Sequence, residues 1–85
     1  MSDYKIDLPF IDNSQGQIKF WKVTPSDNYL NDILTGHTYA KKAINFMESQ
    51  GLTPLFSKIV KDMPDEYSGI EIGFLEEIAQ RAIQN

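Results

Sequence analysis

Three stretches with apolar residues at helical spacing fill most of residues 24–84, and each has its own start and stop signals. The segment TPSD at 24–27 is typical of a helix start: threonine can cap, proline suits the first helical position, and aspartate occupies a capping-box site. Apolar residues then recur from Leu30 to Met47, and Gly51 is typical of a left-handed C-cap. The sequence therefore predicts a first helix over residues 26–50.

Gly36 lies inside this first helix and leaves two alternatives open. The helix either breaks there into two or continues through, at an interior-glycine cost of roughly 1 kcal/mol relative to alanine. We favour a continuous or kinked helix, because Gly36, Ala40 and Ala43 align on one side as a strip of small residues. Such a strip indicates the close approach of another backbone.

A second helix is predicted over residues 54–63. Thr53-Pro54 repeats the start signal, and Pro64 ends the helix because proline has no amide hydrogen and clashes with the preceding turn.

A third helix is predicted over residues 69–84. Ser68 and Glu71 fit the S/T-x-x-E capping box, and an apolar face follows at helical spacing. Gly73 lies in the first turns of this helix, where an interior glycine indicates the same close backbone approach as Gly36.

The first quarter of the chain has the pattern of a β-hairpin. Residues 4–11 alternate between apolar and polar, and residues 12–16, DNSQG, are a cluster of turn formers. The return strand 17–23 is apolar on both faces, of which only one can meet the helices. The predicted fold class is therefore α+β: an N-terminal β-hairpin packed on three α-helices, or four if the first breaks, in a single small globular domain over residues 1–85.

Length and composition exclude several functions. In a chain of 85 residues, folding hides only roughly 60–65% of the unfolded surface, so a deep enclosed active site is not expected. The chain has no cysteine and one histidine, His37, which excludes disulfides, zinc–thiolate sites, cysteine catalysis and any site that needs two imidazoles. The acids around Pro64 do not match a calcium loop, and no nucleotide fingerprint is present, so we expect no metal and no cofactor.

The formal net charge of -4 is unevenly distributed. Residues 1–45 carry as many acids as bases, so the whole net charge lies in residues 46–85. Nucleic-acid binding needs a basic footprint, and none is visible. The acidic half is either a solvated surface that keeps the protein soluble or a face that docks onto a basic partner. No stretch of about 18 apolar residues exists, and the N-terminus lacks a signal-peptide pattern, so we expect a cytoplasmic protein that does not enter membranes.

Partner binding is expected through two surfaces. Tryptophan and tyrosine are enriched where proteins bind partners, so Trp21 is the candidate exposed anchor, together with Phe20 and Tyr29. Core packing is the alternative for these aromatic residues. The acidic surface would comprise Asp65, Glu66, Glu76 and Glu77. For the acids that begin the last helix, stabilisation by the helix dipole is the alternative.

Residues 36–44, GHTYAKKAI, followed by residues 69–75, GIEIGFL, resemble short uncharacterised proteins encoded by bacteriophages and prophages. The resemblance covers about half of the chain. It implies an accessory role, since such small acidic proteins often bind and inhibit host proteins, including CRISPR–Cas and other defence machinery. The leading expectation is therefore a non-enzymatic inhibitor that binds a larger host protein or complex in the host cytoplasm, with anti-CRISPR or related anti-defence activity as its most specific form.

A second expectation comes from a different class: an oligomeric protein that binds a small molecule, such as a nucleotide signal. Its pocket would lie between subunits, because one chain of this length is too small to enclose much ligand. His37, Lys41 and Lys42 would contact the phosphates. No catalytic pattern is present, so an enzyme is not expected.

Overall fold

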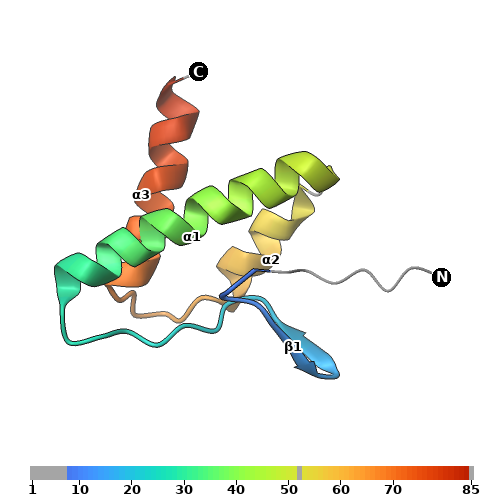
Figure 1. The fold of residues 1–85 in the computed structure, drawn as a ribbon, viewed down its shortest axis with the longest axis horizontal. Coiled ribbons are helices and arrows are strands. Elements are labelled where there is room, and N and C mark those ends of the chain that lie inside the picture. The colour runs from blue at the N-terminus through green and yellow to red at the C-terminus, as the bar shows by residue number, and fades with distance from the viewer. Residues whose placement is uncertain (1–7, 52, 85) are drawn as a thin grey trace.

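Two long helices that cross one another form the centre of the fold. They are α1, Tyr29–Gln50, and α3, Gly69–Gln84. The computed structural model describes residues 8–51 and 53–84, and the third helix within them is α2, Pro54–Asp62. Figure 1 shows α1 lying across α3 and, farther along its length, across α2. The fold is therefore a three-helix, bundle-like arrangement.

The α+β fold class predicted from the sequence is wrong. The expected hairpin of strands 4–11 and 17–23 is not seen, and the fold is built from helices. Extended pairing among the described residues is confined to a short ribbon that joins β1, Asp12–Gln15, to β2, Gln17–Lys19. Its first strand occupies the segment expected to be the turn, its second covers only the start of the expected return strand 17–23, and the ribbon contributes no layer to the core.

The alternating pattern near the N-terminus predicted a strand, but the first described residues pack as a loop. Residues 4–7 of the expected strand lie outside the described part of the chain. Leu8, Phe10 and Ile11 are all buried, whereas a strand would point Phe10 and Ile11 to opposite faces. The Ile11 amide donates a hydrogen bond to the Leu8 carbonyl, N···O 3.1 Å, so the chain turns here. Contact with the helices on several sides, rather than alternation, shapes this segment.

Helix α1 begins at Tyr29 rather than at residue 26, so the predicted TPSD start is wrong. Its N-cap is Asn28, whose side-chain oxygen accepts a hydrogen bond from the Asn31 amide at 3.1 Å. Ser26 has another partner, because its hydroxyl donates to the buried carboxylate of Asp32 at 2.8 Å. That bond holds the preceding loop against the helix.

The other helix boundaries agree closely with the sequence. Helix α1 continues through Gly36 and ends at Gly51, which has the expected left-handed conformation with φ of 67°. The predicted capping box of α3 is confirmed, because the Ser68 amide donates to the Glu71 carboxylate at 2.5 Å. These signals act within one helical turn, so they do not depend on the rest of the fold.

Helices α1 and α3 touch backbone to backbone at their glycines. A Cβ atom placed on Gly36 would collide with the Ile70 carbonyl oxygen, and one placed on Gly73 would collide with the Ile33 carbonyl oxygen. The predicted close approach at both glycines is therefore confirmed. It brings the N-terminal half of each helix against the other (Figure 1).

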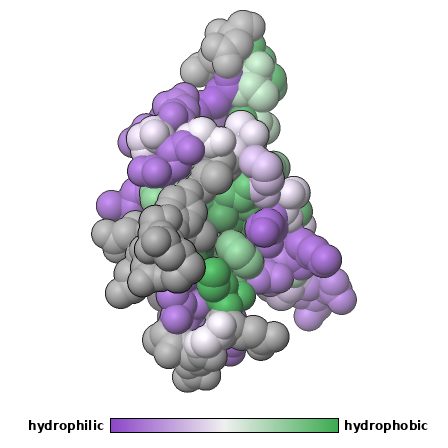
Figure 2. Space-filling model, turned by 90° about the vertical axis from the view of Figure 1, so that its right-hand side faces the viewer, coloured by the Kyte–Doolittle hydropathy of each residue, from purple (hydrophilic) through white to green (hydrophobic). Residues whose placement is uncertain are grey.

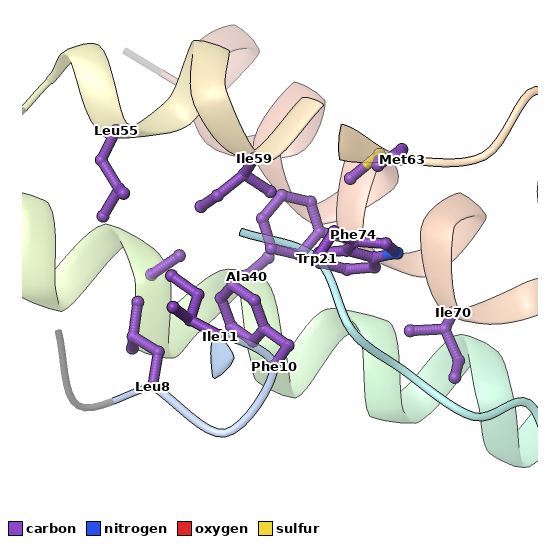
Figure 3. Packing of buried hydrophobic residues seen from close by; sticks show 11 residues of the cluster. Leu8, Phe10, Ile11, Trp21, Ala40, Leu55, Ile59, Met63, Ile70 and Phe74 are labelled. Atoms are coloured by element: carbon purple, nitrogen blue, oxygen red, sulfur yellow. The ribbon is translucent and has the colours of Figure 1, made fainter. Parts of the chain in front are cut away.

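The core centres on three aromatic rings. The Trp21 ring centroid lies 4.9 Å from that of Phe74 and 5.2 Å from that of Phe10. Figure 3 shows Ile59 and Met63 of the α2 region beside these rings. The buried hydrophobic cluster comprises Leu8, Phe10, Ile11, Trp21, Ala40, Ala43, Leu55, Ile59, Met63, Ile70 and Phe74. Among the described residues, no helix is long and apolar enough to cross a membrane.

Candidate functional site

Trp21 was the predicted exposed anchor, and that prediction is wrong. The residue is only 7% exposed, and its indole packs against the rings of Phe10 and Phe74. Its Nε1–H donates a hydrogen bond of 2.6 Å to a Glu71 carboxylate oxygen. The segment around Trp21 lies against the helices as irregular chain, so the indole meets the core and its one polar atom meets a buried acid.

The role of Glu71 was only partly predicted from the sequence. The capping box explains its bonds from Ser68, whose amide and hydroxyl both donate to Oε1. The sequence did not predict that the same carboxylate would be 1% exposed and would also accept the Trp21 bond. A buried carboxylate is tolerated when it is hydrogen-bonded, and three donors meet that need here. Glu71 therefore ties the segment around Trp21 to α3.

A cluster of charged side chains joins α1 to α3 on the surface. The Glu77 carboxylate accepts hydrogen bonds from His37 Nδ1 at 2.8 Å and from Arg81 Nε at 3.1 Å. The second ring nitrogen of His37 lies 3.4 Å from a Glu76 oxygen. Because both ring nitrogens face carboxylates, only the protonated imidazolium can donate to both. The His37 bond chiefly, with Arg81 and the positive charge of Lys41, lowers the pKa of Glu77 against the opposing effect of desolvation.

Glu77 should make stability depend on pH in the acid range. Because its folded-state pKa lies below the ordinary value of 4.5, its contribution is complete above about pH 4.5 and is lost as pH falls through the folded pKa. We expect wild type to be more stable than Glu77→Gln at neutral pH, and this difference to shrink below about pH 4.5. Urea unfolding followed by circular dichroism over a series of pH values measures it. A difference that stays constant into strong acid would show that the ionised carboxylate does not hold the helices together.

The remaining predicted site residues occupy different environments. Phe20 is partly buried against the core, and its amide donates to the Asp62 carboxylate at 2.9 Å. Tyr29 is 55% exposed, and Asp65 and Glu66 are exposed in the loop before α3. Glu76 is exposed as well, whereas Glu77, at 8% exposure, is buried in the cluster described above. The expected surface of four acids is therefore reduced to three.

Two exposed leucines are part of the surface that the sequence did not reveal. Leu30 and Leu34 are 71% and 63% exposed, although helical spacing had placed them with the apolar residues of α1. Leu34 lies midway in sequence between the buried residues Asp32 and Gly36, about 200° around the helix from each. The buried face of α1 is narrow, because α1 packs on α3 through Gly36. Both leucines point away from this face.

The chain segments at this end of the molecule are rich in acids. Tyr29 lies against Gly69, the first residue of α3, and Asp65 and Glu66 lie three and four residues before Gly69 in the chain. Residues 23–40 and 62–80 contain no lysine or arginine. Their acids are Asp27, Asp32, Asp62, Asp65, Glu66, Glu71, Glu76 and Glu77. We refer to Tyr29, Leu30, Leu34 and the exposed acids Asp27, Asp65 and Glu66 as the acidic end.

The phosphate-binding alternative finds little support in the geometry. Both ring nitrogens of His37 already face glutamate oxygens, at 2.8 and 3.4 Å. Those carboxylates would repel a phosphate placed beside the ring. Lys41 and Lys42 are exposed on α1. Within residues 8–51 and 53–84, no three histidine, cysteine, aspartate or glutamate side chains are grouped so as to hold a metal ion.

Comparison of the chain with protein-family models, with curated proteins and with solved structures found no match. The phage and anti-CRISPR terms that followed from the sequence resemblance have no support, and they are not part of the function proposed below. The function is therefore inferred from the surface of the molecule itself.

Proposed function

We propose that the protein is a non-enzymatic binding module that docks its acidic end onto a larger protein with a basic and apolar surface. The observation that carries this proposal is the exposure of Tyr29, Leu30 and Leu34 on the first turns of one helix. Large apolar side chains that gather on a surface mark interaction sites more often than isolated ones do. A partner that covered them would also remove their apolar area from water.

The charge around these residues supports a basic partner. Asp27, Asp65 and Glu66 are exposed, and residues 23–40 and 62–80 carry no lysine or arginine, although Lys19 and Lys22 line a hollow beside Glu66. Charge of one sign speeds the encounter with a surface of opposite sign and disfavours partners of like charge. The acidic end thus combines an apolar contact area with a charge that selects the partner.

The other titratable groups support a binding role rather than a chemical one. The carboxylates of Asp32, Glu71 and Glu77 each accept hydrogen bonds from within the fold, and each bond joins segments that the fold must hold together. Among the described residues, every buried side-chain nitrogen and oxygen has a hydrogen-bond partner. The positions of these carboxylates are thus explained by their contribution to the stability of the fold.

Two double variants test the proposal. Leu30→Ser with Leu34→Ser removes the apolar contact, and Asp65→Lys with Glu66→Lys reverses the charge. We expect a protein that wild type captures from cell lysate to be lost with the leucine variant, with a dissociation constant raised at least about tenfold. The leucine variant should mainly speed dissociation, whereas the charge variant should mainly slow association. Surface plasmon resonance with the recovered partner separates the two rates.

The matched control is Ile83→Ser, which removes a side chain that is 82% exposed near the end of α3, away from the acidic end. It should bind as wild type does. Circular dichroism establishes that each variant is folded. If the folded leucine and charge variants both bind at wild-type rates, the acidic end is not the interface.

A further inference from the structure

A hollow with a volume of about 610 Å³ lies beside the first turns of α1. Its lining comes from the loop before α1, from one side of α1, and from Ile70 in the first turn of α3. Leu34 also lines it, so the hollow is continuous with the acidic end. In Figure 1 these turns of α1 lie at the left, the side turned away from the viewer in Figure 2. The volume is within the range of sites that hold small ligands.

Asp32 contributes a buried carboxylate to the lining, because the residue is only 6% exposed. Its donors among the described residues both belong to Ser26: the amide lies 3.1 Å from each carboxylate oxygen, and the hydroxyl donates to Oδ1 at 2.8 Å. No lysine, arginine or histidine of the described chain is paired with Asp32. Buried charges in proteins are usually paired, and Oδ2 still has acceptor capacity. The hollow therefore holds a negative charge that a cationic ligand would compensate.

Three hydroxyl groups line the same hollow without a partner. Those of Thr24, Thr35 and Tyr39 form no hydrogen bond with any described residue. Each hydroxyl oxygen can accept a hydrogen bond, so the lining offers neutral acceptors beside the carboxylate. An anion would be repelled by Asp32, whereas a cation with several N–H donors would be attracted and could satisfy the hydroxyls as well.

The geometry at Asp32 favours a lysine ammonium over an arginine guanidinium. The Ser26 amide is equidistant from both carboxylate oxygens, so it occupies the edge that a guanidinium needs for bidentate binding. An ammonium group is a compact charge that needs one oxygen and can turn its other two donors toward hydroxyls. Lysine also has an apolar stem, for which Leu34 and Ile70 provide apolar contact in the same lining.

We propose that this hollow binds a lysine side chain of the partner protein, with the ammonium group at Asp32 and the alkyl stem along Leu34. The inference rests on the proposed function, because a basic partner supplies the lysine. It adds a specificity-determining residue to that function. The exposed acids of the acidic end attract any basic surface, whereas Asp32 selects one that presents a lysine at this position.

A lysine side-chain analogue tests the site without any partner. We expect n-butylammonium, titrated into isotope-labelled wild-type protein, to cause saturable NMR shifts of the amides around the hollow. Asp32→Asn should raise the dissociation constant at least about tenfold, since it removes the charge that makes the hydrogen bond strong. Thr35→Val should weaken binding by a smaller factor, and n-butylguanidinium should bind more weakly than n-butylammonium. Glu48→Gln, which removes an exposed acid near the other end of α1, is the matched control and should bind as wild type does.

Both variants in the hollow are designed to keep the fold. Asn at position 32 retains an oxygen that can accept the Ser26 bonds, and the Thr35 hydroxyl has no partner to lose. Circular dichroism checks each variant, and Thr35→Val decides the matter if Asp32→Asn does not fold. Wild type that shows no saturable binding of n-butylammonium overturns the inference. So does a folded Asp32→Asn that binds it as wild type does, or n-butylguanidinium that binds equally well.

The partner recovered by wild type provides the second measurement. Asp32→Asn should raise the dissociation constant for that partner at least about tenfold, mainly by faster dissociation. If the amine analogue binds the hollow but the partner binds Asp32→Asn as tightly as wild type, the hollow takes free amines and the inference is overturned. The leucine and charge variants described above test the proposed function separately, so its failure is distinguishable from the failure of this site.

Discussion

Replacing Gly73 by leucine is expected to lower the free energy of unfolding by about 3 kcal/mol or more. A Cβ atom at this position would collide with the Ile33 carbonyl oxygen and would lie 2.8 Å from the carbonyl carbon. Side chains relieve overpacking by changing rotamer, but a hydrogen-bonded backbone carbonyl inside a helix can move only if the helix moves with it. The two central helices of the fold would therefore have to separate.

Alanine at the same position makes the test sharper. At a solvent-facing site in a helix, Gly→Ala stabilises by roughly 1 kcal/mol through helix propensity. Here the methyl group meets the Ile33 backbone, so Gly73→Ala should destabilise instead, and the sign of the change reports the contact. For a domain of this size we expect thermal melting of Gly73→Leu to fall by more than about 10 °C. Ala79→Leu, on the exposed side of α3, is the matched control and should melt near wild type.

A melting temperature that is unchanged or raised by Gly73→Ala would mean that α1 and α3 do not meet at this glycine. Gly36→Ala approaches the same contact from the other helix and should destabilise as well, because its Cβ would collide with the Ile70 carbonyl oxygen. Since the two glycines share one contact, the effects of the two substitutions should not add.

Removing the indole nitrogen of Trp21 is expected to have the second large effect. Trp21→Phe should lower the free energy of unfolding by about 1.5–3 kcal/mol, the range for a lost hydrogen bond to a charged group. The substitution leaves one oxygen of the buried Glu71 carboxylate without its 2.6 Å donor. It also removes part of the ring that packs on Phe74.

A double-mutant cycle with Glu71→Gln isolates the hydrogen bond from the packing. The neutral amide removes the charge that makes the Trp21 bond strong, so Trp21→Phe should cost less in the Glu71→Gln background than in wild type. Urea unfolding followed by circular dichroism is the measurement, because Trp21→Phe removes the one tryptophan of the chain. Tyr29→Phe, at an exposed aromatic residue, serves as the control and should stay within about 0.5 kcal/mol of wild type. Additive effects of the two core substitutions would show that the indole and the carboxylate do not interact.

Signals confined to one helical turn determined most of the helix boundaries from the sequence alone. The Ser68–Glu71 capping box and the Gly51 C-cap act between residues at most four positions apart, so the same bonds form whatever the rest of the chain does. The start of α1 shows where this reasoning ends. Ser26 bonds to Asp32, a residue held in place by the packing of α1. Asn28 is therefore the N-cap, and the helix begins after it.

Only the tertiary structure decided which of the apolar and acidic residues lie at the surface. Trp21 and Glu71 are 50 positions apart in the chain, and His37 and Glu77 are 40 apart, so no local pattern indicates that either pair meets. The glycine contact between α1 and α3 brings His37 to Glu77, whereas Trp21 is buried by its packing on Phe10 and Phe74, and Leu30 and Leu34 are left exposed. Composition and periodicity show which residues can be buried. Which of them are buried depends on the faces that α1 and α3 turn toward each other, and the glycine contact determines those faces.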